Sequence, residues 1–240
     1  MKEERYNRFV NATVSEAPPP PTDTGSGFAR RFVSFPYRRF APERVVGTMT
    51  VDEWDVFVRE AKHKYHYVYG KVVQMAGASY EHNQLQANFG RALGNIFESD
   101  NIACQAIGSD MRVFVRRGLY YFPDIVVVCG NAQVDEREAL RNPAAVIEVL
   151  SPTTENDDRT DKFREYQSIE SLRHYVLVDQ SRVAVTHFEK LPDGLWAIRA
   201  DFRDRHDTLA LTFGDTIAAV PLSHIYRGVA LPDLEEVAAF

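Results

Sequence analysis

The stretch "YYFPDIVVV", residues 120–128, decides the fold together with "AAVIEVLSP", residues 144–152. Both segments are almost continuously apolar, which is typical of central strands covered on both faces of a sheet. Each carries one lone acid: Asp124 follows a proline at the start of the first strand, and Glu148 stands in the middle of the second. A buried carboxylate is costly unless it is paired, protonated or bound to a cation. If the two strands are neighbours, the acids converge at one end of the sheet and offer the hard oxygen ligands that Mg²⁺ or Mn²⁺ prefers.

A lysine follows on the helix predicted for "DDRTDKFREYQSI", residues 157–169. Lys162 stands beside Phe163 and one turn before Tyr166, at the edge of the buried face. An amine there can lean over the metal, position an attacking water and stabilise charge on a phosphorane-like transition state. Taken alone, the three residues are an ordinary turn aspartate, an ion-paired glutamate and a solvated lysine. Their joint order favours a metal-dependent site that hydrolyses a phosphodiester.

Hydrophobic periodicity predicts the elements around this site. A helix begins at residue 50 with capping-box spacing, a hairpin over residues 65–77 turns near Gly70, and residues 79–99 form a helix with one apolar face. Strands, a short helix and further strands follow. The order predicts an α/β (α+β) fold, a mixed central sheet flanked by helices with an N-terminal hairpin and helix layer.

The first 46 residues look separate from the folded domain, which we expect over residues 47–240. The segment 15–27 is proline-rich and polar, and 28–40 alternates arginine pairs with aromatic residues. This semi-ordered arm either packs on the domain or makes no contact. Alternatively, it binds nucleic acid through its arginines and aromatic rings. The whole chain has a net charge of −6, which counts against tight nonspecific binding of nucleic acid but leaves room for a local basic patch.

No apolar run approaches the length of a membrane span, and the N-terminus has no apolar segment of the secretory type. Two cysteines, Cys104 and Cys129, make no disulfide framework, and we expect both to be plain core residues. A reducing cytoplasm is therefore the expected location.

Several segments, in order, resemble the Uma-type restriction endonucleases, a branch of the PD-(D/E)XK nuclease superfamily. They are the Pro-Asp pair at 123–124, "EVLSPTTENDDRTDKFREY", "SLRHYVLVDQ", "YGKVVQMAGASYEHNQLQANFGRAL" and "CQAIGSDMRV". The resemblance covers roughly residues 47–227. It implies a restriction-endonuclease-like core that cleaves DNA with a divalent metal. Asp124 and Glu148 would then bind the metal. The usual lysine two positions after the second acid is replaced by Leu150, and Lys162 on the following helix would take its place.

Three further residues are supporting candidates. The family usually has a glutamate in the segment "KYHYVYGK", where this chain has His66, and this departure puts activity in doubt more than fold. His82 falls on the apolar face of its helix, either as a buried hydrogen-bonded histidine or as an active-site residue. Asp110 is either a turn residue or an additional acid near the metal. Asp158 is most simply a helix cap.

Three arginines, Arg112, Arg116 and Arg117, could contact backbone phosphates, although a solvated strand end is their simpler role.

Two rival functions stay open. One is a catalytically weakened module of nuclease fold that binds nucleic acid or regulates. The other is a protein-interaction domain. A homodimer is an open alternative too, because cutting two strands benefits from two sites.

Overall fold

The computed structural model describes residues 44–152 and 154–231. These residues fall into two compact units: an N-terminal unit of residues 44–75 and 117–119, and a C-terminal unit of the other described residues. The predicted arm lies outside the described residues except for its last three, and the first strand begins at Val45, inside it. The predicted domain boundaries at residues 46 and 47 stay a prediction.

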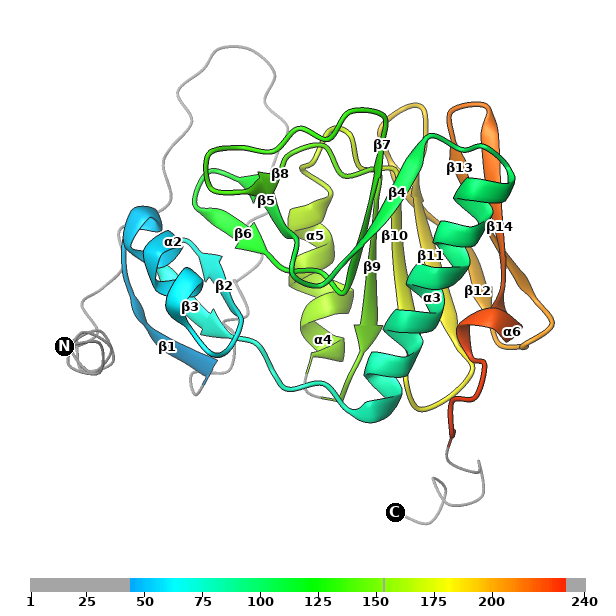
Figure 1. The fold of residues 1–240 in the computed structure, drawn as a ribbon, viewed down its shortest axis with the longest axis horizontal. Coiled ribbons are helices and arrows are strands. Elements are labelled where there is room, and N and C mark those ends of the chain that lie inside the picture. Colours follow the sequence, from blue (N-terminus) through cyan, green and yellow to red (C-terminus); the bar gives the residue numbers. More distant parts are fainter. Residues whose placement is uncertain (1–43, 153, 232–240) are drawn as a thin grey trace. The chain divides into compact units, whose positions relative to one another are not determined.

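The N-terminal unit is a helix on a small antiparallel sheet (Figure 1). Helix α2 (Val51–Glu60) begins at the predicted capping box, since Thr50 and Glu53 each accept from the other's backbone N–H. Its buried face carries Trp54, whose indole N–H donates to the carbonyl of Tyr65. The strands are β1 (Val45–Thr48), β2 (Tyr65–Val68) and β3 (Lys71–Gln74), in the order β1-β3-β2. The predicted hairpin at Gly70 is confirmed, and its φ of +88° suits glycine.

The C-terminal unit is built on a six-stranded mixed sheet in the order β12-β11-β10-β9-β7-β4. Strands β9 and β10 are parallel and β7 and β9 are antiparallel. In chain order the bounds are β4 (Cys104–Gly108), β7 (Ile125–Cys129), β9 (Ala145–Leu150), β10 (His174–Asp179), β11 (Val185–Lys190) and β12 (Trp196–Phe202). The predicted neighbouring central strands are therefore β7 and β9, and every residue of β9 is buried.

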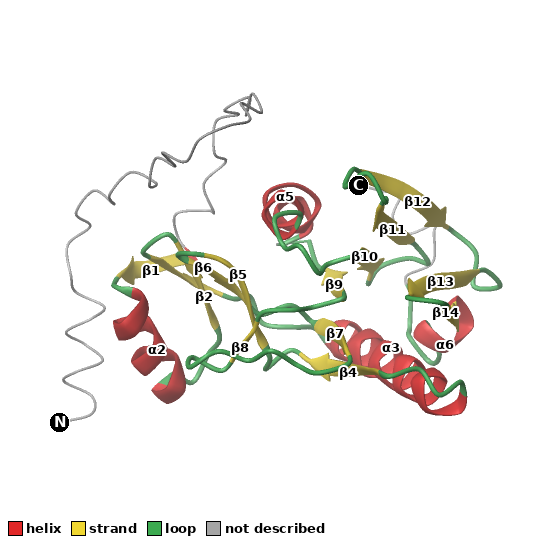
Figure 2. Cartoon of the chain, turned by 90° about the horizontal axis from the view of Figure 1, so that it is seen from above, coloured by secondary structure: helices red, strands yellow, loops and turns green. Residues whose placement is uncertain are grey.

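Helices cover both faces of this sheet (Figure 2). On one face lies α3 (Tyr80–Ser99), which buries Leu85, Phe89 and Leu93 against the sheet. Beside α3 lie the hairpin of β13 (Thr208–Phe213) and β14 (Thr216–Pro221) and the short helix α6 (Leu222–Ile225). On the other face lie α4 (Glu155–Asp157), a π-helical segment (Asp158–Lys162) and α5 (Phe163–Tyr166). The remaining strands are β5 (Arg112–Arg116), β6 (Leu119–Tyr121) and β8 (Ala139–Leu140).

Two expectations are corrected here. Cys104 and Cys129 are not plain core thiols, because they face each other across β4 and β7 and are joined by a disulfide. Asp158 is not the N-terminal cap of the helix: the helix begins at Glu155, and Asp158 opens the π-helical segment with its side chain 2% exposed. Within the described ranges no helix is both long and apolar enough to cross a bilayer.

Candidate active site

Asp124 and Glu148 lie side by side where β7 begins. The antiparallel register pairs Ile125 with Ile147, so the preceding Asp124 stands opposite Glu148. Oδ2 of Asp124 accepts a 2.7 Å hydrogen bond from the backbone N–H of Val149, and its own N–H makes a long 3.4 Å contact with Oε2 of Glu148. Both acids are buried, 9% and 3% exposed. The sheet pairing therefore brings together two carboxylates that are 24 positions apart in the chain.

Lys162 points into the same cluster from the π-helical segment, which lies on the face of the sheet opposite α3. Its Nζ lies 3.1 Å from Oε1 of Glu148 and 2.8 Å from Oδ1 of Asp158, and the residue is 6% exposed. The hydroxyl of Tyr166 is 3.4 Å from the same Glu148 oxygen. The amine predicted to lean over a metal is thus turned inward to the acids, and a third carboxylate, that of Asp158, holds it there.

Burial raises the pKa of Glu148 to about 8; the Lys162 ammonium opposes this shift, and the carboxylates of Asp158 and Asp124 add to it. Burial alone would lower the pKa of Lys162, but Asp158 and Glu148 outweigh that effect and raise it. At neutral pH, therefore, Lys162 is charged, Asp158 is its nearer counterion, and Glu148 holds a proton for much of the time. A cluster with more acids than cations is one that an added cation stabilises.

Helix α3 supplies His82 from the other face of the sheet. Its Nε2 lies 3.2 Å from Oδ2 of Asp124, and the ring is 8% exposed. Ser79 caps the helix by accepting from the His82 backbone N–H, which fixes the first turn against the strand end. One turn on, the side-chain amide of Gln86 donates to the carbonyl of Asp124 at 2.8 Å. Two residues of α3 thus hold Asp124 by its carboxylate and by its backbone.

Sequence reasoning did not assign Asp158, Tyr166 or Gln86 to the site. Asp158 and Lys162 are four positions apart, the spacing at which opposite charges meet on a helix, and this signal could have linked them. Tyr166 lies four further positions along the same face. No local pattern marks Gln86, because its partner is a backbone carbonyl 38 positions away.

The two other supporting candidates, His66 and Asp110, belong to other elements of the chain. His66 is buried on β2 of the N-terminal unit, opposite Val73 of the hairpin, and its predicted departure from a family glutamate stays a prediction. Asp110 is exposed in the turn between β4 and β5. The predicted roles of both residues stay predictions.

The three arginines differ from one another. Arg112 is buried, with its guanidinium carbon 5.9 Å from the centroid of the Phe122 ring, so it is not a solvated strand end. Arg116 is half-exposed and pairs with Glu165. Arg117 is exposed. Their proposed phosphate contacts stay predictions.

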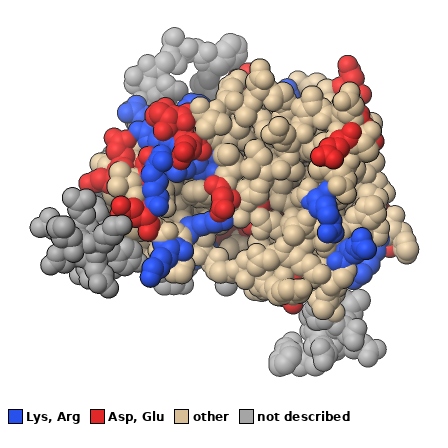
Figure 3. All heavy atoms as spheres, viewed as in Figure 1, with Lys and Arg blue, Asp and Glu red and all other residues tan. Residues whose placement is uncertain are grey.

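On the face drawn in Figure 3, basic side chains of the described residues stand in small groups, with acidic ones nearby, and much of the C-terminal unit's surface is uncharged. That face offers only local charge to a nucleic-acid backbone.

The two acids fit a divalent ion that keeps part of its water shell. In the described ranges no three or more His, Cys, Asp and Glu side chains form a ligand group. Mg²⁺ commonly takes only one or two carboxylates from a protein and retains several waters. Oδ1 of Asp124 makes no hydrogen bond within the described residues, and Oε2 of Glu148 makes only the 3.4 Å contact. One oxygen of each acid thus remains for a cation.

The mixed sheet, its helices on both faces and the acid pair at the start of β7 define a mixed α+β protein of restriction-endonuclease-like fold. A solved structure from Anabaena variabilis ATCC 29413, described as a putative nuclease belonging to DUF820, covers 76% of this chain and 99% of its own, with a TM-score of 0.58 and 16% identity. That likeness shows the fold. Residues 50–219 match the family model Uma2, described as putative restriction endonuclease, and the chain belongs to this family.

Two relatives come from Synechocystis sp. (strain ATCC 27184 / PCC 6803 / Kazusa). The uncharacterized protein sll1609 is 30% identical over 153 residues, which is 62% of this chain and 85% of that protein. The uncharacterized protein slr1290 is 29% identical over 201 residues, which is 82% of this chain and 96% of that protein. The predicted family and fold are confirmed.

Proposed function

We propose that this protein is a divalent-metal-dependent endonuclease that hydrolyses phosphodiester bonds of DNA. The observation that carries the proposal is the contact set at the start of β7: Asp124 and Glu148 side by side, with the ammonium of Lys162 3.1 Å from Glu148. Membership in the Uma2 family supports nuclease chemistry in general. The description of the fold neighbour as a putative nuclease agrees with it.

Asp124 and Glu148 would hold Mg²⁺ or Mn²⁺ through the oxygens that the protein leaves unengaged. When bound, such an ion polarises a phosphoryl oxygen and lowers the pKa of a coordinated water. Glu148 must give up its proton to bind the ion, and the cation's charge favours that loss. The Val149 N–H and His82 keep the Asp124 carboxylate in one orientation while the ion binds.

Lys162 would act as a fixed positive charge. Because the carboxylates of Asp158 and Glu148 raise its pKa although burial opposes them, it does not lose a proton near neutral pH and is no general base. Its N–H groups can donate to the attacking water or to a phosphate oxygen and stabilise the negative charge that develops in the transition state. Asp158, one turn before Lys162, holds the ammonium in place.

The test is nicking of supercoiled plasmid DNA by the full chain with Mg²⁺, with Mn²⁺ and with chelator. We expect cleavage that requires metal and is lost in Asp124→Asn and Glu148→Gln. Asp201→Asn is the matched control, because it removes one carboxylate from the edge strand β12, separated from β9 by β11 and β10. A second readout is thermal unfolding: Mn²⁺ at 100 times its Kd should stabilise the wild type by about 2.7 kcal/mol and Asp124→Asn far less.

The outcomes separate the rivals. Metal-independent DNA binding without cleavage under either ion would replace the nuclease by a nucleic-acid-binding module of the same fold. If the protein neither binds DNA nor is stabilised by metal, the remaining rival is a protein-interaction domain.

A further inference from the structure

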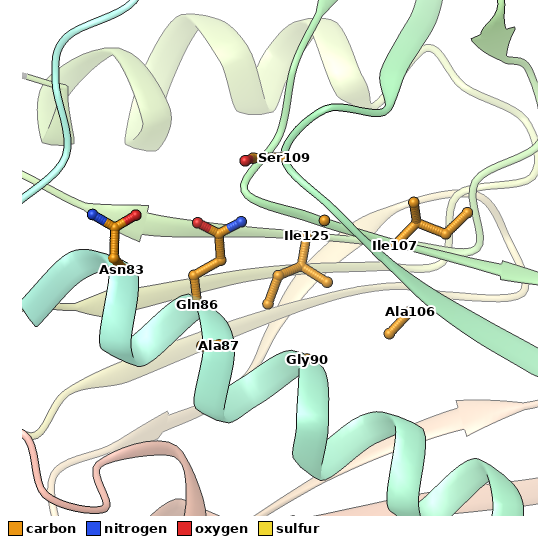
Figure 4. A pocket seen from close by; sticks show the side chains of 9 residues that line it. Asn83, Gln86, Ala87, Gly90, Ala106, Ile107, Ser109 and Ile125 are labelled. Atoms are coloured by element: carbon orange, nitrogen blue, oxygen red, sulfur yellow. The ribbon is translucent and has the colours of Figure 1, made fainter.

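A hollow of about 410 Å³ lies in the C-terminal unit between the first half of α3 and strand β4 (Figure 4). Its polar lining comes from Asn83, Gln86 and Ser109, and its apolar lining includes Ile107 and Ile125. The volume is that of a small-molecule site. Asn83 and Ala87 are exposed, so the hollow opens to solvent.

The two amide side chains in the hollow have fixed orientations. Nδ2 of Asn83 donates to the carbonyl of Ser79 at 2.8 Å, and Nε2 of Gln86 donates to the carbonyl of Asp124 at 2.8 Å. A backbone carbonyl only accepts, so each amide must present its nitrogen to it. Figure 4 shows the result: the two amide oxygens are the ends turned toward each other. The hollow therefore presents a pair of hydrogen-bond acceptors.

The hollow adjoins the acid cluster through shared residues. Gln86 binds the backbone of Asp124, and Ile125, the next residue, lines the hollow. His82, next to Asn83 on α3, contacts the Asp124 carboxylate. A group seated in the hollow thus lies beside the place where a metal and a phosphate would sit.

We propose that this hollow binds an unpaired nucleobase carrying an exocyclic amine, next to the phosphate that is cut. The proposal rests on the nuclease function above. Two acceptors suit the N–H groups of the amines on cytosine, adenine and guanine. Thymine carries a carbonyl at the equivalent position, and its oxygen would face two amide oxygens. The side chains of Ile107 and Ile125 give the base an apolar surface.

Gly90 offers a way to close the hollow without disturbing the fold. It lines the hollow, and a Cβ added there meets nothing within 4 Å. Gly94, one turn further along α3, is equally open but does not line the hollow. Both are interior helix positions, where replacing glycine by leucine favours the helix. Gly90→Leu fills the site, and Gly94→Leu is its matched control.

The experiment measures the affinity of the full chain for single-stranded oligo-dC and oligo-dT of equal length by fluorescence anisotropy, in chelator so that nothing is cut. Comparing two pyrimidines removes the difference in ring size. We expect oligo-dC to bind roughly five- to tenfold more tightly, the discrimination of one well-placed hydrogen-bonded pair. Gly90→Leu and Asn83→Ala should abolish the preference, and Gly94→Leu should keep it.

Equal affinities for the two oligomers, or a preference that survives in Gly90→Leu, would overturn the subsite. The proposed cleavage is tested independently of the base preference. Asp124→Asn should abolish metal-dependent nicking and leave the preference for oligo-dC unchanged. A base preference that depends on Asn83 in a protein that never nicks DNA would support the subsite and reject the nuclease.

Discussion

The ammonium of Lys162 lies between two buried carboxylates, 2.8 Å from Oδ1 of Asp158 and 3.1 Å from Oε1 of Glu148. All three residues are less than a tenth exposed. With Asp124 beside Glu148, one cation faces three acids. In the native cluster Lys162 therefore balances the charge of one carboxylate, and a proton or a metal ion must balance the charge that is left on the other two.

Lys162→Met should destabilise the metal-free protein by about 3 kcal/mol, because removing one partner of a buried ion pair leaves the other uncompensated. Mn²⁺ should restore more stability to this variant than it adds to the wild type, since the ion supplies charge that the lysine no longer does. Denaturant unfolding with and without Mn²⁺ measures both effects.

Arg182→Met is the control for that experiment. Arg182 pairs with Asp179 at 2.8 Å, but its side chain is 57% exposed, so its loss should cost less than about 1 kcal/mol. Equal losses of stability in the two variants would contradict the ascribed role of the Lys162 cluster.

The raised pKa of Glu148, about 8, gives a definite pH dependence. Between the ordinary value of 4.5 and about 8, the native protein holds a proton that the unfolded chain has released. Stability of the metal-free protein should therefore fall as pH rises through this window, by at most about 1.4 kcal/mol per pH unit. Unfolding in chelator at pH 6.5 to 8 measures the slope, and Glu148→Gln should flatten it.

Metal affinity should change in the opposite sense, because protons and the cation compete for Glu148. Titration with Mn²⁺ should show tighter binding as pH rises toward about 8 and little further gain above it. Affinity that is independent of pH in the wild type would mean that Glu148 is not a ligand.

The sequence predicted the acid pair because its signal is strong and local. An acid within a doubly covered strand is an exception to the rule of apolar burial, and two such strands in succession are natural neighbours. The position of Lys162 at the edge of the buried helix face predicted the lysine, and the family resemblance agreed with it. The partner of that lysine was missed, since an aspartate near a helix start is usually a cap and nothing in the pattern predicts a π-helical turn over Asp158–Lys162.

The cysteine pair shows the other limit of sequence reasoning. Cys104 and Cys129 meet only because β4 pairs with β7 in one register, which is a property of the whole sheet. The hollow beside Asp124 is similar in one respect, because the Gln86 amide is oriented by the backbone carbonyl of Asp124, 38 positions away. Local periodicity gives elements and buried faces, and long-range pairing decides which side chains meet.

A buried histidine pair should make the protein sensitive to acid. Nε2 of His174 lies 2.8 Å from the carbonyl of Thr212 and must carry the hydrogen, so Nδ1 accepts from Nε2 of His187 at 3.0 Å. Burial lowers the pKa of His187 to about 3, and the neighbouring His174 adds to this. The unfolded chain takes up a proton below about pH 6.5 that the native protein refuses, so stability is lost as pH falls from 6.5 toward 3.

The variant that checks this is His187→Gln, whose side-chain amide can still donate to His174 but does not titrate. As pH falls from 6.5 to 4, the wild type should lose unfolding free energy relative to His187→Gln by up to about 1.4 kcal/mol per pH unit, whatever the other groups contribute to both proteins. His206→Gln, at an exposed position, should keep the wild-type slope. Parallel slopes for His187→Gln and the wild type would refute the pair as the origin of acid sensitivity.

The bond between Cys104 and Cys129 closes a loop across 25 positions and ties the edge strand β4 to β7, which carries Asp124 at its start. Chain-entropy arguments for a loop of this length give about 3.5 kcal/mol of stabilisation. Reduction, or the double change Cys104→Ser and Cys129→Ser, should lower the free energy of unfolding by about that amount, measured by denaturant unfolding with and without reductant. The reductant should leave the stability of the double variant unchanged. Two free thiols titrated in the unreduced, unfolded protein would show instead that the cysteines are not joined, and β4 would then be held only by its backbone ladder.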